Sequence, residues 1–108
     1  MKVCPVDSDC IAFETIEEFE EAFRRLADDE ELTGETCVEG NSGLEFETVK
    51  DWVDYFGLEN VYFENSFDDN FVTEFYFDLR NAKHKGKVWL MNADEVSIQD
   101  GFLRIWFD

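Results

Sequence analysis

The sequence predicts an α+β fold in which two amphipathic helices pack on one face of a mainly antiparallel sheet of four or five strands. Three observations predict this fold. Apolar residues recur at helical spacing in the first half of the chain, they alternate with period two in the second half, and an Asp-Gly pair typical of a tight hairpin lies near the C-terminus. The 108 residues, 44% of them hydrophobic, are enough for one core and too few for a second domain. We therefore expect residues 1–108 to form a single acidic domain.

The first helix is expected from about Ile16 to Ala27. Thr15 before it is a suitable N-cap residue, and the acidic side chains of its first half suit the positive end of the helix dipole. Near its end, basic residues can pair with acids four positions earlier. These pairs are Glu20 with Arg24 and Glu21 with Arg25. The expected buried stripe is Ile16, Phe19, Phe23 and Leu26.

The second helix is expected from Val49 to Phe56, with Thr48 as its N-cap and Gly57 as the left-handed residue after its end. Its start resembles that of the first helix, because residues 13–23 align with residues 46–56 at a shift of 33 positions that also places Cys4 on Cys37. No third copy follows, so a stacked repeat is disfavoured. Two similar helix starts explain the match. The expected buried stripe is Val49, Trp52, Val53 and Phe56.

Beyond Gly57 the apolar period changes to two, which indicates strands. Residues 71–79 alternate between the two sides of a half-buried strand. The other expected strands are Val61 to Glu64 before a turn at Asp68–Asn70, Lys87 to Met91 after a turn at Asn81–Gly86, and a hairpin of Val96 to Ile98 with Leu103 to Phe107 across Asp100–Gly101. Residues Thr36 to Phe46 are expected to form a hairpin or a loop.

The charge of the chain excludes several classes of partner. It has 27 Asp and Glu against 9 Lys and Arg, a formal net charge of −18, and its 17% aromatic content predicts a folded rather than a disordered acidic chain. Direct nucleic-acid binding needs a basic surface and is not expected. No apolar run reaches the roughly 20 residues of a membrane helix, and no signal-peptide pattern opens the chain. We expect no membrane association and a cytoplasmic location.

Cysteine and histidine do not predict a metal site. Cys4, Cys10 and Cys37 are expected to be reduced thiols, with a Cys4–Cys10 disulfide as the alternative. His84 is the only histidine, it lies far from every cysteine, and no C-x-x-C pair is present. We therefore expect neither zinc nor another cofactor.

Catalytic motifs are also missing from the sequence. It has no Gly-rich phosphate loop, no serine elbow and no histidine-containing metal motif. Asp7, Asp9 and the cluster Asp68–Asn70 lack the glycine and final glutamate of a calcium loop, and are interpreted as turn residues. With so many acids, closeness alone cannot identify a general acid and base. We expect a protein that is not an enzyme.

The excess acids are concentrated before residue 80. Residues 1–79 contain 23 acids and 4 bases, whereas residues 80–108 contain 4 acids and 5 bases. The nine carboxylates between Glu14 and Glu31 would spread over about 27 Å of helix, roughly one charge per 3 Å, close to the ~3.4 Å between phosphates on one DNA strand. A net charge of about 2 to 8 is enough for solubility, so the excess indicates a positively charged partner. Halophilic adaptation is the competing explanation.

In size, acidity and aromatic content the chain is similar to the general class of nucleic-acid mimics, which includes phage proteins that block restriction or CRISPR nucleases and inhibitors of uracil excision. The likeness is one of composition and covers no motif. It implies a noncatalytic inhibitor that occupies the basic groove of a DNA- or RNA-processing protein. The expected partner-binding residues are Glu17, Glu20, Glu21, Asp28, Asp29, Glu30 and Glu31, supported by Asp51 and Asp54.

Two other functions fit the composition. An immunity protein or antitoxin would neutralise one basic toxin through a central hot spot rather than through many similar contacts. A protein-interaction domain with incidental acidity would use its sheet, and exposed indoles of Trp89 and Trp106 would be its sign. The sequence leaves the oligomeric state open.

Four basic residues and His84 gather between Arg80 and Lys87. We interpret this segment as a hairpin tip with a structural or peripheral role, because Asn81 and Gly86 suit a turn and lysines protect strand ends from unwanted pairing.

Overall fold

A computed structural model of the protein describes residues 2–27, 31–38, 44–65, 72–80 and 93–107. None of the helices in these ranges is long and apolar enough to cross a membrane. In chain order the elements are β1 (Lys2–Cys4), β2 (Asp7–Ala12), α1 (Ile16–Leu26), α2 (Phe46–Phe56), a short 3-10 turn (Leu58–Asn60), β3 (Val61–Glu64), β4 (Glu74–Asp78), β5 (Glu95–Gln99) and β6 (Phe102–Trp106).

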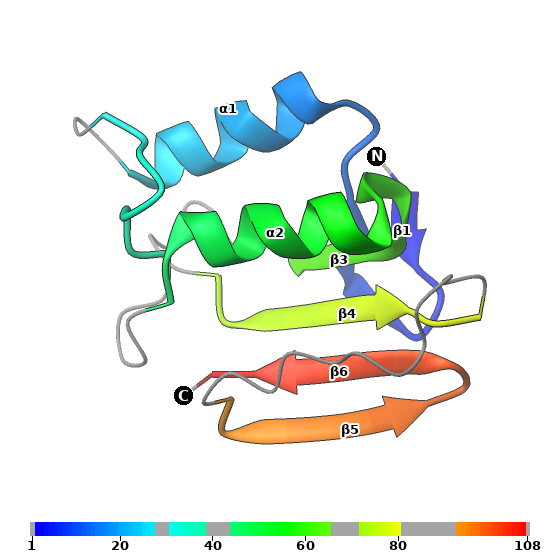
Figure 1. The fold of residues 1–108 in the computed structure, drawn as a ribbon. Helices are drawn as coiled ribbons and strands as arrows, with labels where there is room; N and C mark the ends of the chain where they lie inside the picture. The colour runs from blue at the N-terminus through cyan, green and yellow to red at the C-terminus, as the bar shows by residue number, and fades with distance from the viewer. Residues whose placement is uncertain (1, 28–30, 39–43, 66–71, 81–92, 108) are drawn as a thin grey trace.

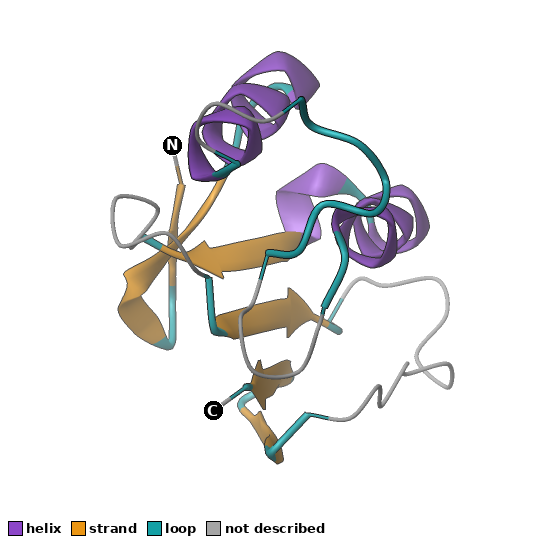
Figure 2. Cartoon of the chain, turned by 90° about the vertical axis from the view of Figure 1, so that its left-hand side faces the viewer, coloured by secondary structure: helices purple, strands orange, loops and turns teal. Residues whose placement is uncertain are grey.

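The strands form one antiparallel sheet in the order β1-β2-β3-β4-β6-β5. Both helices lie on one side of this sheet, as two perpendicular views show (Figure 1, Figure 2). We call the two helices the helix layer and the side of the sheet away from them the open face; this side also has buried residues, among them Tyr62, Tyr76 and Phe102. The predicted α+β class and the position of the helices are confirmed, but the described residues form six strands rather than four or five.

The main core lies between the helix layer and the middle of the sheet. Phe19 and Phe23 of α1 both pack on Phe63 of β3, with ring centroids 5.6 Å apart. Trp52 of α2 packs edge-on against Phe75 of β4 at 5.3 Å. Replacing a buried aromatic of this size by alanine typically costs about 3–5 kcal/mol, so these rings fix the helix layer on β3 and β4.

The prediction for α1 is confirmed at its start. Thr15 is extended, and its Oγ1 accepts the backbone N–H of Glu18 at 3.2 Å. The helix ends at Leu26, with Ala27 as its C-cap. The predicted stripe is buried except for Ile16, which is 39% exposed.

The prediction for the start of α2 is wrong. The helix begins at Phe46, and Thr48 lies inside it instead of capping it. The N-cap residue Glu45 makes no side-chain capping bond; instead the backbone N–H groups of Phe46 and Glu47 donate to the carbonyls of Thr36 and Gly34 at 2.8 and 2.9 Å. Backbone partners from the preceding loop thus replace a capping side chain.

The two halves of the 33-residue pattern consequently differ in structure. Thr15 caps its helix, whereas the aligned Thr48 does not. Gly57 after α2 has the expected positive φ, 91°. The segment predicted as a hairpin or a loop contains one isolated bridge, between Cys37 and Glu45.

The predicted strand pairs in the second half are confirmed where the structure describes them. Val61 of β3 pairs with Phe77 of β4, and β5 pairs with β6 through the expected turn. Asp100 and Gly101 have φ values of 52° and 84°, the two positive angles that a tight hairpin turn needs. The predicted strand Lys87–Met91 and the turns at Asp68–Asn70 and Asn81–Gly86 lie outside the described residues.

The hairpin of β1 and β2 was not predicted. Its register changes between Val3, opposite Ile11, and Cys4, opposite Asp7, so residues 8–10 form a bulge in β2. Asp7 accepts the backbone N–H of Asp9 at 2.9 Å within this bulge. Both aspartates thus belong to a bulged strand, and their interpretation as turn residues is corrected. The short, irregular strands hid the alternation that would have indicated them.

Candidate functional site

The helix layer presents carboxylates to solvent. Glu17 and Glu21 of α1 are exposed, as are Asp51 and Asp54 of α2, and Glu20 is half-buried. These residues lie away from the aromatic stripes that pack on the sheet, as the helical spacing of the acids predicts. We call Glu17, Glu20, Glu21, Asp51 and Asp54 the acidic surface.

A groove between the two helices brings part of this surface together. Glu20 of α1 lines one side, and Asp51 and Asp54 of α2 line the other. Two bases, Arg24 and Lys50, line the same groove. A second hollow lies along α1 and is lined by Glu17, Glu18, Glu20, Glu21, Arg24 and Arg25, with Phe13 at its base.

One arginine neutralises part of the acidic surface. Arg24 lies 3.0 Å from Glu21 and 3.7 Å from Glu20, so the predicted pair of Glu20 with Arg24 is confirmed, and the same arginine also reaches Glu21. The Arg24 side chain is 54% exposed. Exposed pairs of this kind contribute only about 0–1 kcal/mol and leave the carboxylates open to a stronger partner.

The remaining predicted binding residues lie after α1. Glu31 is exposed. Asp28, Asp29 and Glu30 lie outside the described residues.

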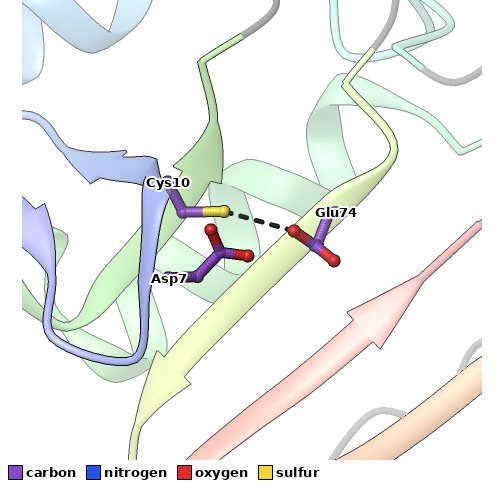
Figure 3. Close-up of side chains that lie close together, drawn as sticks. All are labelled: Asp7, Cys10 and Glu74. Carbon is purple, nitrogen blue, oxygen red and sulfur yellow. Dashed lines mark hydrogen bonds between the residues drawn. The ribbon is translucent and has the colours of Figure 1, made fainter.

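A second group of acids lies on the open face and was not predicted. Asp7 and Cys10 of β2 approach Glu74 of β4, with the ligand atoms of all three side chains within 4.8 Å of one another (Figure 3). We call these three residues the polar cluster. Positions three apart point to opposite sides of a regular strand, so the bulge in β2 is what turns Asp7 and Cys10 to the same side.

Arg104 of β6 neutralises this part of the open face. Its guanidinium donates to Glu74 at 2.6 Å and to Glu95 of β5 at 2.9 Å. Burial alone would lower the pKa of Arg104, but the hydrogen bonds to the two carboxylates raise it. The Glu74 side chain is only 16% exposed, so this ion pair is better shielded from water than the pairs of Arg24.

The pKa values of the two carboxyl groups in the polar cluster are shifted in opposite directions. Burial raises the pKa of Glu74, and the negative charge of Asp7 adds to this effect, while Arg104 opposes it. Burial would also raise the pKa of Asp7, but hydrogen bonds from the backbone of Asp9 and from the side chains of Glu74 and Tyr76 lower it. Of the two carboxyl groups, Glu74 is therefore the one that binds a proton more readily.

The cysteine of the cluster is a buried thiol. Cys10 is 0% exposed, and its Sγ donates to Glu74 at 3.5 Å. Burial and the nearby carboxylates raise its pKa, as burial does for Cys4. Both residues are thiols rather than a disulfide, which confirms the expected reduced state for this pair, and neither has the lowered pKa of a reactive thiol. Cys37 is exposed.

Two carboxylates and a thiolate form a donor set for a divalent cation such as zinc, which would displace the proton of the Cys10 thiol. Arg104 already provides a positive charge against Glu74 at 2.6 Å. The guanidinium therefore balances part of the negative charge of the cluster, which can stabilise the sheet without a metal. No sequence pattern indicates the cluster, because Cys10 and Glu74 are 64 positions apart.

Two further cations lie over aromatic rings of the open face. Lys2 Nζ lies 5.3 Å from the centre of the Tyr62 ring, and the Arg80 guanidinium lies 4.6 Å from that of Phe102. Arg80 also donates two side-chain hydrogen bonds to the buried Asp78, at 3.0 and 3.1 Å, and lowers its pKa. Arg80, the first residue of the segment expected to have a structural or peripheral role, thus has a structural contact.

Comparison with protein-family models, with curated proteins and with solved structures found no match.

Proposed function

We propose that the protein is a noncatalytic inhibitor that mimics nucleic acid and occupies the basic groove of a DNA- or RNA-processing protein, of the anti-restriction or anti-CRISPR type. The observation that carries this proposal is the contrast between the two sides of the molecule. Acids of the open face are held by Arg104 and Arg80, whereas the acidic surface of the helix layer faces solvent.

The position of the acids on α2 supports a binding role over a structural one. Acids in the first turn of α1, such as Glu17, stabilise the positive end of its dipole. Asp54 lies in the last turn of α2, where the dipole disfavours an anion, and that turn contains no basic residue. A carboxylate at this position costs folding free energy, so a role outside folding explains it better.

The geometry of the acidic surface suits a phosphate-binding partner. Glu17 and Glu21 are about 6 Å apart along α1 at 1.5 Å per residue, and the groove adds a second row of carboxylates from α2. Two rows of anions resemble the two phosphate strands of a nucleic acid in arrangement, with about 6 Å between Glu17 and Glu21 against ~3.4 Å between phosphates along one strand. Lysines and arginines that normally bind phosphates would pair with these carboxylates, so association should be fast and weakened by salt.

The test is capture from a lysate of the source organism on the immobilised protein, with duplex DNA and salt as competitors. We expect the retained partner to be a nucleic-acid-binding protein that either competitor releases. A partner that is indifferent to both DNA and salt would contradict the mimic.

Matched variants locate the surface. Asp51→Asn with Asp54→Asn removes two charges from the groove, and Asp9→Asn with Asp100→Asn removes two charges elsewhere. We expect the first pair to weaken binding several-fold and the second pair to leave it nearly unchanged. If one position abolishes binding while its neighbours contribute nothing, the result favours the immunity-protein alternative.

The third function, a protein-interaction domain with incidental acidity, had exposed indoles as its expected sign. Trp106 is half-buried, and Trp89 lies outside the described residues. In the same experiment this function predicts a partner that binds the double variant Asp51→Asn with Asp54→Asn as tightly as the wild type.

A further inference from the structure

β5 forms one edge of the sheet and is exposed along its whole length (Figure 1). Val96 and Ile98 are 44% and 68% exposed, although their cross-strand partners on β6, Ile105 and Leu103, belong to the core. The helix layer packs on β3 and β4, which leaves these two apolar side chains beyond its reach. Among the described strands, only β6 pairs with β5.

The other edge of the sheet is protected against pairing. β1 has three residues, carries Lys2, is followed by Pro5 and is interrupted by the register shift after Val3. Lysine, proline, bulges and short length are the features by which natural sheets avoid association through their edges. β5 has none of them, because its five residues keep a regular register with β6 and include neither lysine nor proline.

The charge of β5 is also unusual for this chain. The segment 96–99 reads Val-Ser-Ile-Gln and has no ionisable side chain, although 33% of all residues are charged and the net charge is −18. A copy of the same chain is repelled by most of the molecule. A regular strand whose residues 96–99 are uncharged is where such a copy can approach at the least electrostatic cost.

We propose that β5 pairs with β5 of a second copy of this chain, in antiparallel orientation about a two-fold axis, to form a continuous sheet across the dimer. With Ser97 opposite Ser97 of the partner subunit, Val96 faces Ile98 of the partner subunit on the helix side. On the open side, Glu95 faces Gln99 of the partner subunit, which can donate to its carboxylate. Residues 95–99 are therefore complementary to themselves on both sides, whereas Asp94 and Asp100, which flank them, face each other across the pair and repel.

Neighbouring registers are poorer. Shifting the pairing by two residues places Ile98 opposite Asp94 of the partner subunit, or Val96 opposite Asp100 of the partner subunit, and shifting it by one residue exchanges the two sides of one strand. The register centred on Ser97 is the one of these that gives both Val96 and Ile98 an apolar partner.

Added salt should have opposite effects on the β5 contact and on the binding of a basic partner by the proposed inhibitor. Two copies with a charge of −18 repel each other, so screening should strengthen the dimer, whereas screening should weaken a basic partner on the acidic surface. The β5 contact uses no residue of the acidic surface. The dimer proposal and the inhibitor proposal can therefore be contradicted independently of each other.

The experiment is analytical ultracentrifugation of the whole chain over a range of protein concentrations at low and high salt. We expect the average mass to rise from 12.7 kDa toward twice that value with concentration, and to rise further in high salt. Ile98→Lys should remove the dimer. The matched control is Val3→Lys on β1, a residue 53% exposed at the opposite edge, which should dimerise like the wild type.

Thermal unfolding of both variants serves as the folding control. We expect both to be folded, because the two side chains are exposed in the wild type. A wild type that stays at 12.7 kDa under all conditions overturns the proposal, whether β5 is then free or occupied by something else. Dimerisation of Ile98→Lys equal to that of the wild type overturns it as well, as does a dimer lost in Val3→Lys.

Discussion

Carboxylates serve different purposes on the two sides of this molecule. On the open face, Glu74 is 16% exposed and lies 2.6 Å from Arg104, within a network that joins β2, β4, β5 and β6. On the helix layer, Glu21 is 58% exposed and pairs with Arg24, which is itself 54% exposed. The comparison shows that acid content by itself does not indicate function. Burial and a fixed partner make an acid structural, and exposure leaves it available to another molecule.

The largest expected effect comes from comparing the two arginines. Arg104→Met keeps an aliphatic stem of similar length but removes the guanidinium. Glu74 is then shielded from water without its cation, so the free energy of unfolding should fall by about 2–3 kcal/mol. Arg24→Met should change it by less than about 0.5 kcal/mol, since its partners are exposed. Urea unfolding of both variants measures the difference. Equal losses would show that the two pairs are shielded alike.

The next largest effect concerns pH. Because the pKa of Glu74 is raised above its ordinary value of 4.5, the folded state binds this proton more tightly than the unfolded state does. The stabilisation that this proton contributes is complete below about pH 4.5 and is lost as the pH rises through the pKa of Glu74 in the folded state. The free energy of unfolding then changes by at most about 1.4 kcal/mol per pH unit. The lowered pKa of Asp7 acts in the opposite direction, and its contribution is lost as the pH falls below 3.8.

Glu74→Gln isolates this effect, because glutamine cannot titrate. Melting temperatures measured between about pH 4.5 and 7.5 should fall less steeply for this variant than for the wild type. Glu18→Gln removes one charge from the exposed helix layer and should keep most of the wild-type slope. Parallel slopes for wild type and Glu74→Gln would place the titrating group elsewhere.

The smallest expected effect tests the acids of the helix layer. Asp54→Asn at the end of α2 should stabilise the fold by about 0.3–1 kcal/mol, because it removes an anion from the negative end of the helix dipole. Glu17→Gln in the first turn of α1 should be neutral or slightly destabilising for the opposite reason. Chemical unfolding of both variants gives the sign. A destabilised Asp54→Asn would mean that this residue has a structural partner.

Local chemistry explains which predictions from the sequence succeeded. Thr15 capped α1 as expected, and Asp100–Gly101 formed the expected turn, because both depend on neighbouring residues only. The start of α2 depends on carbonyls of residues 34–36, and the polar cluster depends on a bulge and on strands far apart in the chain. Neither has a periodic pattern. The acidic surface followed from helical spacing, but its groove required the relative position of two helices.

The strand order described above also has a consequence for folding kinetics. Three pairs of strands are neighbours in both sequence and space: β1 with β2, β3 with β4, and β5 with β6. These three hairpins can form early from local contacts. Joining them requires the pairs β2–β3 and β4–β6, which close longer loops and should come later. Asp7 and Cys10, Glu74, and Arg104 come from three different hairpins. The network among them therefore forms only when the whole sheet has assembled. Arg104→Met should accordingly speed unfolding and leave the refolding rate nearly unchanged.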